Sequence, residues 1–263
     1  MVESLDTSPF EKAAPYYDAH RAPYVPAALD YIISAFGLST GARVLDLGCG
    51  PGTIAIPLSR TGADIVAVDR DAVMLEEARR LAAARAGGRI RWVCARVEDA
   101  LPDLGLFQLV TLGQSLHWMD RDLVLRQLAD VVEDGGGLVI LDEGRRRPQE
   151  SWETTALQVV AKYLGRRGRH PMKHPESAHE PCLARSRHFS GFTVREFPFA
   201  ITRDVASILG WVFSSANATK PMFGIRLADF EAELAEALLS LNPSGVFEEK
   251  IETAVYVAPK IVG

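Results

Sequence analysis

The residues best suited to chemistry lie in one stretch, residues 44–69, which reads VLDLGCGPGTIAIPLSRTGADIVAVD. Three glycines at alternate positions, 48, 50 and 52, separate an apolar run from a helical pattern. Glycine has no side chain, so a ligand can approach the backbone of such a turn closely. Asp69 follows the turn by about 20 residues, where a carboxylate can accept hydrogen bonds from both hydroxyls of a ribose. The pattern predicts a nucleoside-binding site.

The spacing and charge of this turn exclude two common phosphate sites. Dinucleotide sites use G-x-G-x-x-G, whereas these glycines follow G-x-G-x-G with Pro51 between the last two. A phosphate-binding P-loop needs Gly-Lys-Ser/Thr after its glycines, which is absent here. Asp46, just before the turn, disfavours a phosphate and suits a cationic or zwitterionic group, such as the ammonium of an amino acid joined to a ribose. The alternative is a tight turn without a ligand, which would leave both carboxylates unexplained.

Composition narrows the class of protein. The 263 residues are 48% apolar and 24% charged, as in globular domains. The net charge of −5 opposes binding along nucleic-acid phosphates. Cys49, Cys94 and Cys182 are odd in number and lack metal-ligand spacing, which argues against disulfides or a metal site and favours a reducing, cytoplasmic location. The polar amino terminus and the absence of an apolar run of about 18 residues predict no signal peptide and no membrane role.

Charge is concentrated in one segment. Between Gly144 and Gly191 the sequence has ten basic and four acidic residues. The same segment holds the histidines 170, 174, 179 and 188, whose irregular spacing is poor for a metal site. The arginines form either a solvated face or a surface that attracts a carboxylate or phosphate of a substrate.

Alternation of apolar runs and helical patterns predicts an α/β fold. We expect a doubly wound, Rossmann-like, mostly parallel sheet with helices on both faces, a C-terminal antiparallel edge hairpin, and a helical, basic lid insertion after the fifth strand. The core strands are expected at 42–47, 64–69, 89–94, 107–112 and 136–142, and the core helices at 53–61, 71–86 and 120–134. The remaining elements are two short helices between 9 and 36, helices at 151–164, 204–215 and 227–241, and edge strands at 193–201 and 249–258.

The D-L-G-C-G-P-G turn and the acidic end of the second strand resemble class I S-adenosylmethionine-dependent methyltransferases. More narrowly, the chain is similar to the branch with ubiquinone/menaquinone-type and trans-aconitate-type small-molecule enzymes. The similarity covers residues 10–142 in order, through YYDAHRAPY, the glycine loop, DRDAVMLEEAR, VEDALP and QSLHWMD. It implies S-adenosyl-L-methionine as cofactor and methyl transfer to an O, N or C nucleophile of a small molecule.

The resemblance also implies residue roles at the cofactor. The methionine portion would lie among Asp46, Gly48, Cys49 and Gly50, with Asp69 on the ribose, Arg70 and Met74 beside the adenine, and Arg96, Val97 and Glu98 at the adenine edge. Many relatives carry Asp or Asn where Arg96 stands, so Glu98 is the substitute partner for the adenine amino group. Gln114 and Ser115 would lie near the sulfonium, and Tyr17 and Arg21 on a helix that covers the cofactor.

Two of these residues also have purely structural readings. A nucleophilic role for Cys49 lacks a basic neighbour, so we interpret it as a small loop residue. Met74 could equally fill the core beneath its helix.

The acceptor side is less defined. His117 is the candidate catalytic base, and it could instead only shape the pocket. Substrate contacts are expected from Tyr17, His117, Trp118, Trp152 and Trp211. They suit an anionic or aromatic small molecule, and the protein is expected to be a monomer or homodimer that binds neither nucleic acid nor membranes.

The predicted domain organisation assigns one role to each range. Residues 1–40 would cover the cofactor, residues 41–143 and 192–263 would form the core, and residues 144–191 would form a lid.

Two rival functions remain open at this stage. A nucleic-acid methyltransferase of the exocyclic-amine type would carry N/D-P-P-[FYW] after the fourth strand, where this chain has QSLHWMD. A recruited protein would bind S-adenosylmethionine and perform another reaction or none.

Overall fold

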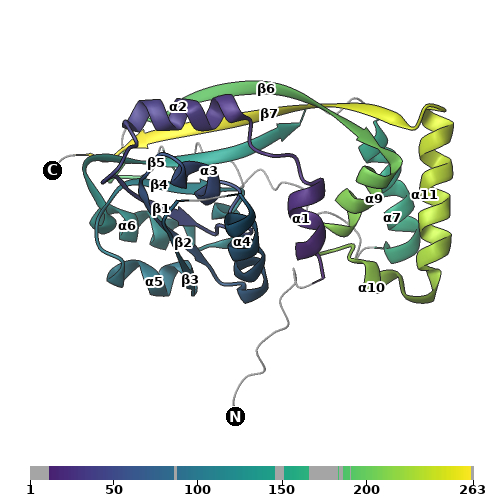
Figure 1. Cartoon of the computed structure of the whole chain (residues 1–263), viewed down its shortest axis with the longest axis horizontal. Helices are drawn as coiled ribbons and strands as arrows, with labels where there is room; N and C mark the ends of the chain where they lie inside the picture. Colours follow the sequence, from purple (N-terminus) through teal and green to yellow (C-terminus); the bar gives the residue numbers. More distant parts are fainter. Residues whose placement is uncertain are drawn as a thin grey trace, which may run out of the picture. The chain divides into compact units, whose positions relative to one another are not determined.

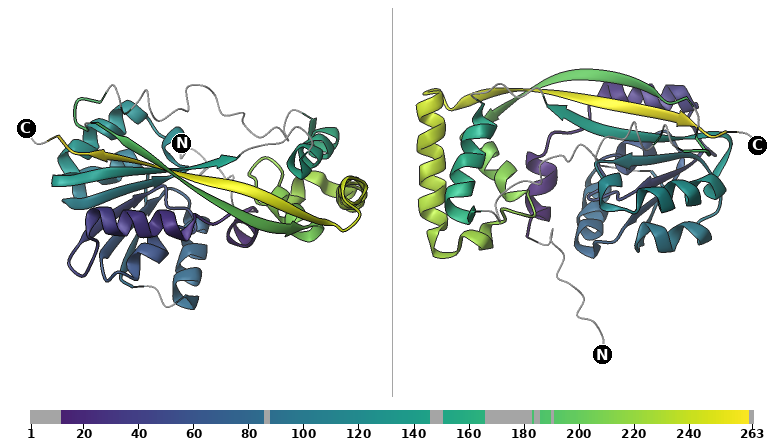
Figure 2. Two further views of the ribbon diagram at one scale, coloured as in Figure 1. Left: turned by 90° about the horizontal axis from the view of Figure 1, so that it is seen from above. Right: turned by 180° about the vertical axis from the view of Figure 1, so that it is seen from behind.

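Seven strands form one sheet in the order β3-β2-β1-β4-β5-β7-β6 in the computed structural model, which describes residues 12–85, 88–145, 151–165, 183, 186–189 and 191–261 (Figure 1). The strands are β1 (Arg43–Leu47), β2 (Asp64–Asp69), β3 (Ile90–Cys94), β4 (Phe107–Gly113), β5 (Val132–Arg145), β6 (Thr193–Asp204) and β7 (Val246–Pro259). β1 pairs in parallel with β2 and β4, β2 with β3, and β4 with β5. The mostly parallel sheet with antiparallel edge strands confirms the predicted fold class (Figure 2).

Contacts divide the chain into two compact units. Unit 1 comprises Met1–Pro23, Arg145–Met172 and Ala200–Ile251, and unit 2 comprises Tyr24–Gly144, Lys173–Phe199 and Glu252–Gly263. β6 and β7 contribute residues to both units. The boundaries of the two units differ from those of the predicted ranges 1–40, 41–143, 144–191 and 192–263. The roles predicted for 1–40 as a cofactor cover and for 144–191 as a lid stay predictions.

The inner strands β1, β2 and β4 of unit 2 are buried on both faces. Leu45 and Leu47 belong to the cluster that packs under α5 and α6, while the alternate residue Val44 belongs to the cluster under α2 and α3. The helices of this unit are α2 (Pro26–Phe36), α3 (Ala55–Ser59), α4 (Ala72–Ala84), α5 (Val97–Ala100) and α6 (Arg121–Val131). Because successive side chains of a strand point to opposite faces, an all-apolar run needs a helical layer on each side.

The boundary between α6 and β5 differs from prediction. α6 ends at Val131 and β5 begins at Val132, four residues before the expected start of that strand. The pairing with β4 shifts between Phe107 and Leu109, so that Phe107 faces Val132 and Leu109 faces Gly137. Gly135 has a φ of +81° in this irregular stretch. A bulge inserts residues into one strand, which apolar periodicity does not reveal.

Unit 1 is helical and has an aromatic core. Its helices are α1 (Ala14–His20), α7 (Trp152–Leu164), α9 (Val205–Phe213), α10 (Lys220–Phe223) and α11 (Leu227–Leu241). The ring of Phe230 stacks on Phe223 with centroids 4.0 Å apart and meets Phe213 edge-on. The indole of Trp152 packs edge-on against Trp211 at 5.1 Å. Such ring pairs stabilise the unit beyond the apolar area that they bury.

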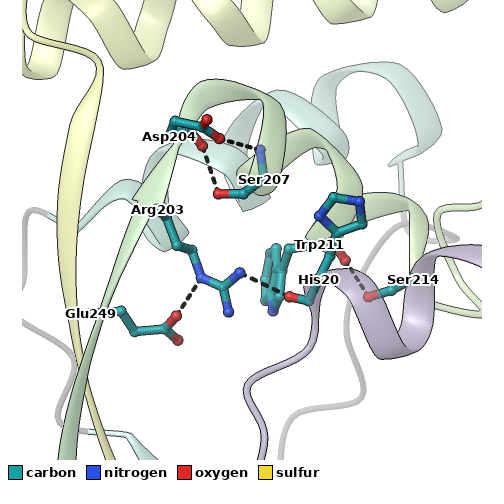
Figure 3. Close-up of polar contacts among 7 residues, drawn as sticks. All are labelled: His20, Arg203, Asp204, Ser207, Trp211, Ser214 and Glu249. Atoms are coloured by element: carbon teal, nitrogen blue, oxygen red, sulfur yellow. Dashed lines mark hydrogen bonds and ion pairs between the residues drawn. The ribbon is translucent and has the colours of Figure 1, made fainter. Parts of the chain in front are cut away.

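A buried ion pair crosses from β6 to β7 within unit 1 (Figure 3). Arg203 Nε donates to Glu249 Oε2, and the two side chains are 4% and 6% exposed. Arg203 Nη1 also donates to the carbonyl oxygen of His20 at the end of α1, at 2.8 Å. The guanidinium lies over the Trp152 ring, 5.3 Å from its centroid. The pair therefore ties two strands and the first helix together.

The described part of the chain contains no helix long and apolar enough to span a bilayer.

We expect Arg203→Met to lower the free energy of unfolding by about 3–5 kcal/mol, because it removes the guanidinium that forms the ion pair with the buried Glu249 carboxylate. The double variant Arg203→Met with Glu249→Leu should recover most of that loss, since two apolar side chains remove both desolvation costs. Urea denaturation of the three proteins measures the difference. Equal stability of the single and double variants would contradict this account.

Candidate functional site

The site lies at the carboxyl ends of β1 and β4, where the strand order reverses. β1 continues to β2 on one side and neighbours β4 on the other, so the loops after β1 and β4 leave in opposite directions. Open α/β sheets bind ligands in the crevice at such a switch point. The glycine turn follows β1, and Gln114 and Ser115 follow β4, which brings these predicted residues to one edge of the sheet.

The glycine turn is held close to β2. The amides of Gly48 and Cys49 both donate to the carbonyl of Val68, at 2.8 and 3.1 Å. Gly48, Gly50 and Gly52 all have positive φ values, +65°, +52° and +83°. Residues other than glycine rarely adopt positive φ values, so the backbone conformation of the turn itself explains the three glycines.

Gly48 is also a point of close approach. A Cβ added there would lie 2.5 Å from Ser115 Cβ, and Ser115 Oγ donates to the carbonyl of Leu47 at 2.6 Å. The turn after β1 and the loop after β4 therefore contact one another directly. A Cβ on Gly50 would meet nothing within 4 Å.

Asp46 is a buried carboxylate beneath the turn. It is 1% exposed, and its Oδ1 accepts from Thr111 Oγ1 at 2.9 Å while its Oδ2 accepts from the Ala55 amide at 3.2 Å. Burial, with a smaller effect of the nearby Asp69, raises the pKa of this carboxyl to about 7 against the opposing effect of the two hydrogen bonds. Asp46 can thus exchange a proton near neutral pH.

Asp69 joins the turn to the start of α4. Its Oδ2 accepts from the Gly50 amide at 2.8 Å, and its Oδ1 accepts from the Asp71 amide at 2.9 Å. Burial raises the pKa of Asp69, and both hydrogen bonds oppose that shift. Asp71 caps α4 by accepting from the amides of Val73 and Met74. A half-buried carboxylate oriented by two amides is well suited to accept from ribose hydroxyls.

Cys49 is buried, and burial raises the pKa of its thiol well above the ordinary value. The thiol therefore stays protonated at neutral pH and is a poor nucleophile. This agrees with its interpretation as a small loop residue.

The predicted adenine residues follow β2 and β3. Met74 is 3% exposed and faces the core, while Arg70 is exposed. Val97 is buried at the start of α5. The Glu98 carboxylate lies 3.7 Å from Arg96 Nε and accepts from the Asp120 amide at 3.3 Å. Glu98 is thus already engaged by protein donors, and its role toward the adenine stays a prediction.

His117 and Trp118 lie in a single 3-10 turn after β4, Leu116–Trp118. Both are exposed, and their ring centroids are 5.2 Å apart. Exposure leaves the His117 imidazole accessible to a substrate, and this accessibility fits either role foreseen for it.

Four other predicted residues belong to unit 1. Arg21 lies over the rings of Tyr17 and Trp211, at 5.5 and 5.8 Å from their centroids. Trp152 and Trp211 are 5% and 3% exposed in the aromatic core. The structure therefore brings these four residues into one unit, and their contacts with cofactor or substrate stay predictions.

Two polar residues at the site were missed. Thr111 is a fully buried polar residue of β4, and its hydroxyl donates to Asp46. Asp142, late in β5, accepts a hydrogen bond from Gln114 Nε2. The signal for Asp142 was present, because it follows a buried apolar run as Asp46 and Asp69 do.

The predicted histidines 170, 174 and 179, like most of the basic segment, lie outside the described residues. Among the residues described, no group of three or more His, Cys, Asp or Glu side chains is placed to hold a metal ion.

Residues 44–136 match the family model of a methyltransferase domain. An uncharacterised methyltransferase of Mycobacterium tuberculosis is 28% identical over 218 residues, covering 82% of this chain and 84% of that protein. A ubiquinone biosynthesis O-methyltransferase of Xanthomonas oryzae is 31% identical over 147 residues, covering 55% of this chain and 61% of that protein. Together, the family model and these relatives support a class I S-adenosylmethionine-dependent methyltransferase.

Solved structures agree on the fold of this methyltransferase. A putative type II methyltransferase from Anaeromyxobacter dehalogenans has a TM-score of 0.65 at 19% identity, covering 92% of this chain and 98% of that chain. A methyltransferase from Thiobacillus denitrificans, solved with S-adenosyl-L-homocysteine, has a TM-score of 0.52 at 18% identity, covering 94% of this chain and 96% of that chain. S-adenosyl-L-methionine is the cofactor of this family.

We expect Gly48→Ala to destabilise the methyltransferase more than Gly50→Ala. Both substitutions place a side chain at positive φ, which costs about 1–2 kcal/mol. Only Gly48→Ala adds a collision with Ser115, worth about 1–3 kcal/mol more. Thermal and urea unfolding measure the pair, and a Gly50→Ala loss as large as that of Gly48→Ala would refute the contact argument.

Stability should fall from pH 5 to pH 8 because of Asp46. The unfolded carboxyl ionises near pH 4, whereas the folded one keeps its proton until about pH 7, so its stabilising proton is lost as pH rises through the folded pKa. The wild type should lose about 3 kcal/mol more across this range than Asp46→Asn, which retains the shape and cannot ionise. Chemical denaturation at both pH values checks this, and parallel pH profiles would count against it.

Proposed function

We propose that this methyltransferase transfers the methyl group of S-adenosylmethionine to an O, N or C nucleophile of a small-molecule acceptor. The observation that carries the proposal is the glycine turn held between Asp46 and Asp69. The 31% identical relative whose name states ubiquinone biosynthesis supports a small acceptor. The net charge of −5 opposes an extended nucleic-acid substrate.

The two carboxylates would divide the recognition of the donor. Asp69, half-buried and oriented by the amides of Gly50 and Asp71, would accept from the ribose hydroxyls. Asp46 is nearly inaccessible, so it would act through its charge on the ammonium and through its support of the turn. The positive-φ turn lets the donor lie directly against the backbone of Gly48 and Gly50.

When bound, S-adenosylmethionine supplies an electrophilic methyl carbon on a positively charged sulfur. The chain's own contribution is to hold the acceptor in line with that carbon and to exclude water. Gln114 and Ser115, at the end of β4, would bound the path of the methyl group. Ser115 is fixed there by its hydrogen bond to the Leu47 carbonyl.

His117 would serve either as the base that removes a proton from the acceptor or as a wall of the pocket. As a base it would need to titrate near neutral pH and to reach the acceptor, and its exposure meets the second condition. As a wall it would act only through position, which suffices for a nucleophile that is already competent.

We expect Asp69→Ala to weaken S-adenosylhomocysteine binding by about 1–3 kcal/mol, about a 5-fold to 150-fold rise in Kd, because the ribose hydroxyls lose their acceptor. Isothermal calorimetry measures this. Asp69→Asn retains the shape and one acceptor oxygen, so it should lose less. Asp103→Ala, at an exposed carboxylate in the turn before β4, is the control and should bind as the wild type does.

The proposal fails if the wild type does not bind S-adenosylhomocysteine or if Asp69→Ala binds it equally well. Tight retardation of RNA or DNA at physiological salt would favour the nucleic-acid alternative. Donor binding without turnover on any acceptor would favour a recruited protein.

A further inference from the structure

Asp142, which the predicted site did not include, forms a hydrogen bond with Gln114, which the predicted site did include. Gln114 follows β4, Asp142 lies late in β5, and these two strands are parallel neighbours in the sheet. Gln114 Nε2 donates to Asp142 Oδ1. Both side chains are half-buried at the carboxyl edge of the sheet, on the β4 side of the switch point.

Gln114 is held in an unusual conformation. Its φ of +51° makes it the one residue other than glycine with positive φ in the described chain. Its amide donates to the carbonyl of Leu141 at 3.1 Å, which adds a backbone bond to β5. Strained backbone of this kind persists only where the surroundings enforce it, and it clusters at functional sites.

The neighbours on both sides of Gln114 are fixed. A Cβ on Gly113 would collide with the Tyr24 hydroxyl and lie 2.5 Å from Ile54 Cδ1. Ser115 is 5% exposed and bonded to the Leu47 carbonyl. The Gln114 side chain is therefore attached to a backbone that cannot shift easily. This backbone lies beside the glycine turn.

The partner determines which end of the Gln114 amide is available. An ionised carboxylate only accepts hydrogen bonds, so the amide nitrogen must face Asp142. The other end, Oε1, accepts a hydrogen bond from none of the residues that the structure describes. The pair thus presents an amide oxygen of fixed orientation at the edge where the donor is proposed to bind.

We propose that Asp142 is a positioning residue that orients Gln114, so that Gln114 Oε1 accepts a hydrogen bond from a hydroxyl or amine of the methyl acceptor. This inference rests on the proposed function and names the acceptor class for it. An acceptor carboxylate has no proton to donate when ionised, and the negative charges of Asp69 and Asp142 at the same edge of the sheet would disfavour it. Of the anionic and aromatic acceptors suggested by the sequence, the pair favours a neutral hydroxyl- or amine-bearing molecule.

The chemistry balances without a proton on Gln114. The nucleophile's lone pair forms the bond to the methyl carbon while the carbon–sulfur bond breaks. The electron pair of the broken carbon–sulfur bond remains on sulfur, which becomes neutral. The nucleophile's proton stays hydrogen-bonded to Gln114 Oε1 until it leaves to solvent or to His117, because an amide is not a base at neutral pH. The hydrogen bond directs the remaining lone pair of the nucleophile, which is a contribution to alignment.

Binding to the S-adenosylhomocysteine complex tests the proposal with two probes, catechol and benzoate. Both are planar, and only catechol carries hydroxyl donors. Calorimetry on the wild-type complex should show catechol binding at least about tenfold more tightly than benzoate. Asp142→Asn lets the Gln114 amide take either orientation, and Gln114→Leu removes the acceptor, so each should reduce the preference below about threefold.

Asp134→Asn, at an exposed carboxylate near the start of the same strand, is the matched control and should retain the preference. The Gln114 side-chain amide resonance should shift in Asp142→Asn and remain in place in Asp134→Asn. S-adenosylhomocysteine affinity should stay within about twofold in Asp142→Asn and Asp134→Asn, which separates this test from failure of the proposed function.

Equal or tighter binding of benzoate, absence of binding by both probes, or an unchanged preference in Asp142→Asn would each overturn the proposal.

Discussion

The structure of the site depends on two hydrogen bonds between backbone amides and carboxylates. The Gly50 amide binds Asp69, and the Ala55 amide binds Asp46. Together they hold a turn without side chains against the ends of β1 and β2. Two neighbouring elements are positioned by this turn. Ser115 packs against Gly48, where a Cβ would collide with it, and Asp69 accepts from the amide of Asp71 at the start of α4.

This arrangement has a cost in stability. Asp46 is almost completely buried, and burial raises its pKa to about 7, so a charged form is disfavoured in the fold. Thr111 and Ala55 offset part of that cost with hydrogen bonds. Under the proposed function, the charge of this carboxylate would serve the ammonium of the donor. Stability and recognition therefore oppose each other at this residue.

Much of the fold was predictable because its signals are local. The Asp71 cap marks the start of α4, and the run from Leu227 to Leu241 has the bounds expected for α11. The bulged start of β5 was not predictable, since it arises from pairing with β4. For the site, the positions of Asp46 and Asp69 around the glycine turn could be predicted from the sequence. The contact between Gln114 and Asp142 could not, because 28 positions separate them and strand order brings them together.

The aromatic residues show the same limit. Trp152 and Trp211 pack against each other in the core of unit 1, and the substrate contact expected of them stays a prediction. Aromatic residues serve cores and ligands equally well, so residue type alone does not separate the two roles.

A crystal structure of the protein with S-adenosylhomocysteine tests the central claim most directly. The account predicts ribose hydroxyls within about 3 Å of the Asp69 carboxylate and the amino-acid end of the ligand against Gly48 and Gly50. A ligand elsewhere on the sheet edge, or a turn that changes shape and releases Asp69 on binding, would contradict it.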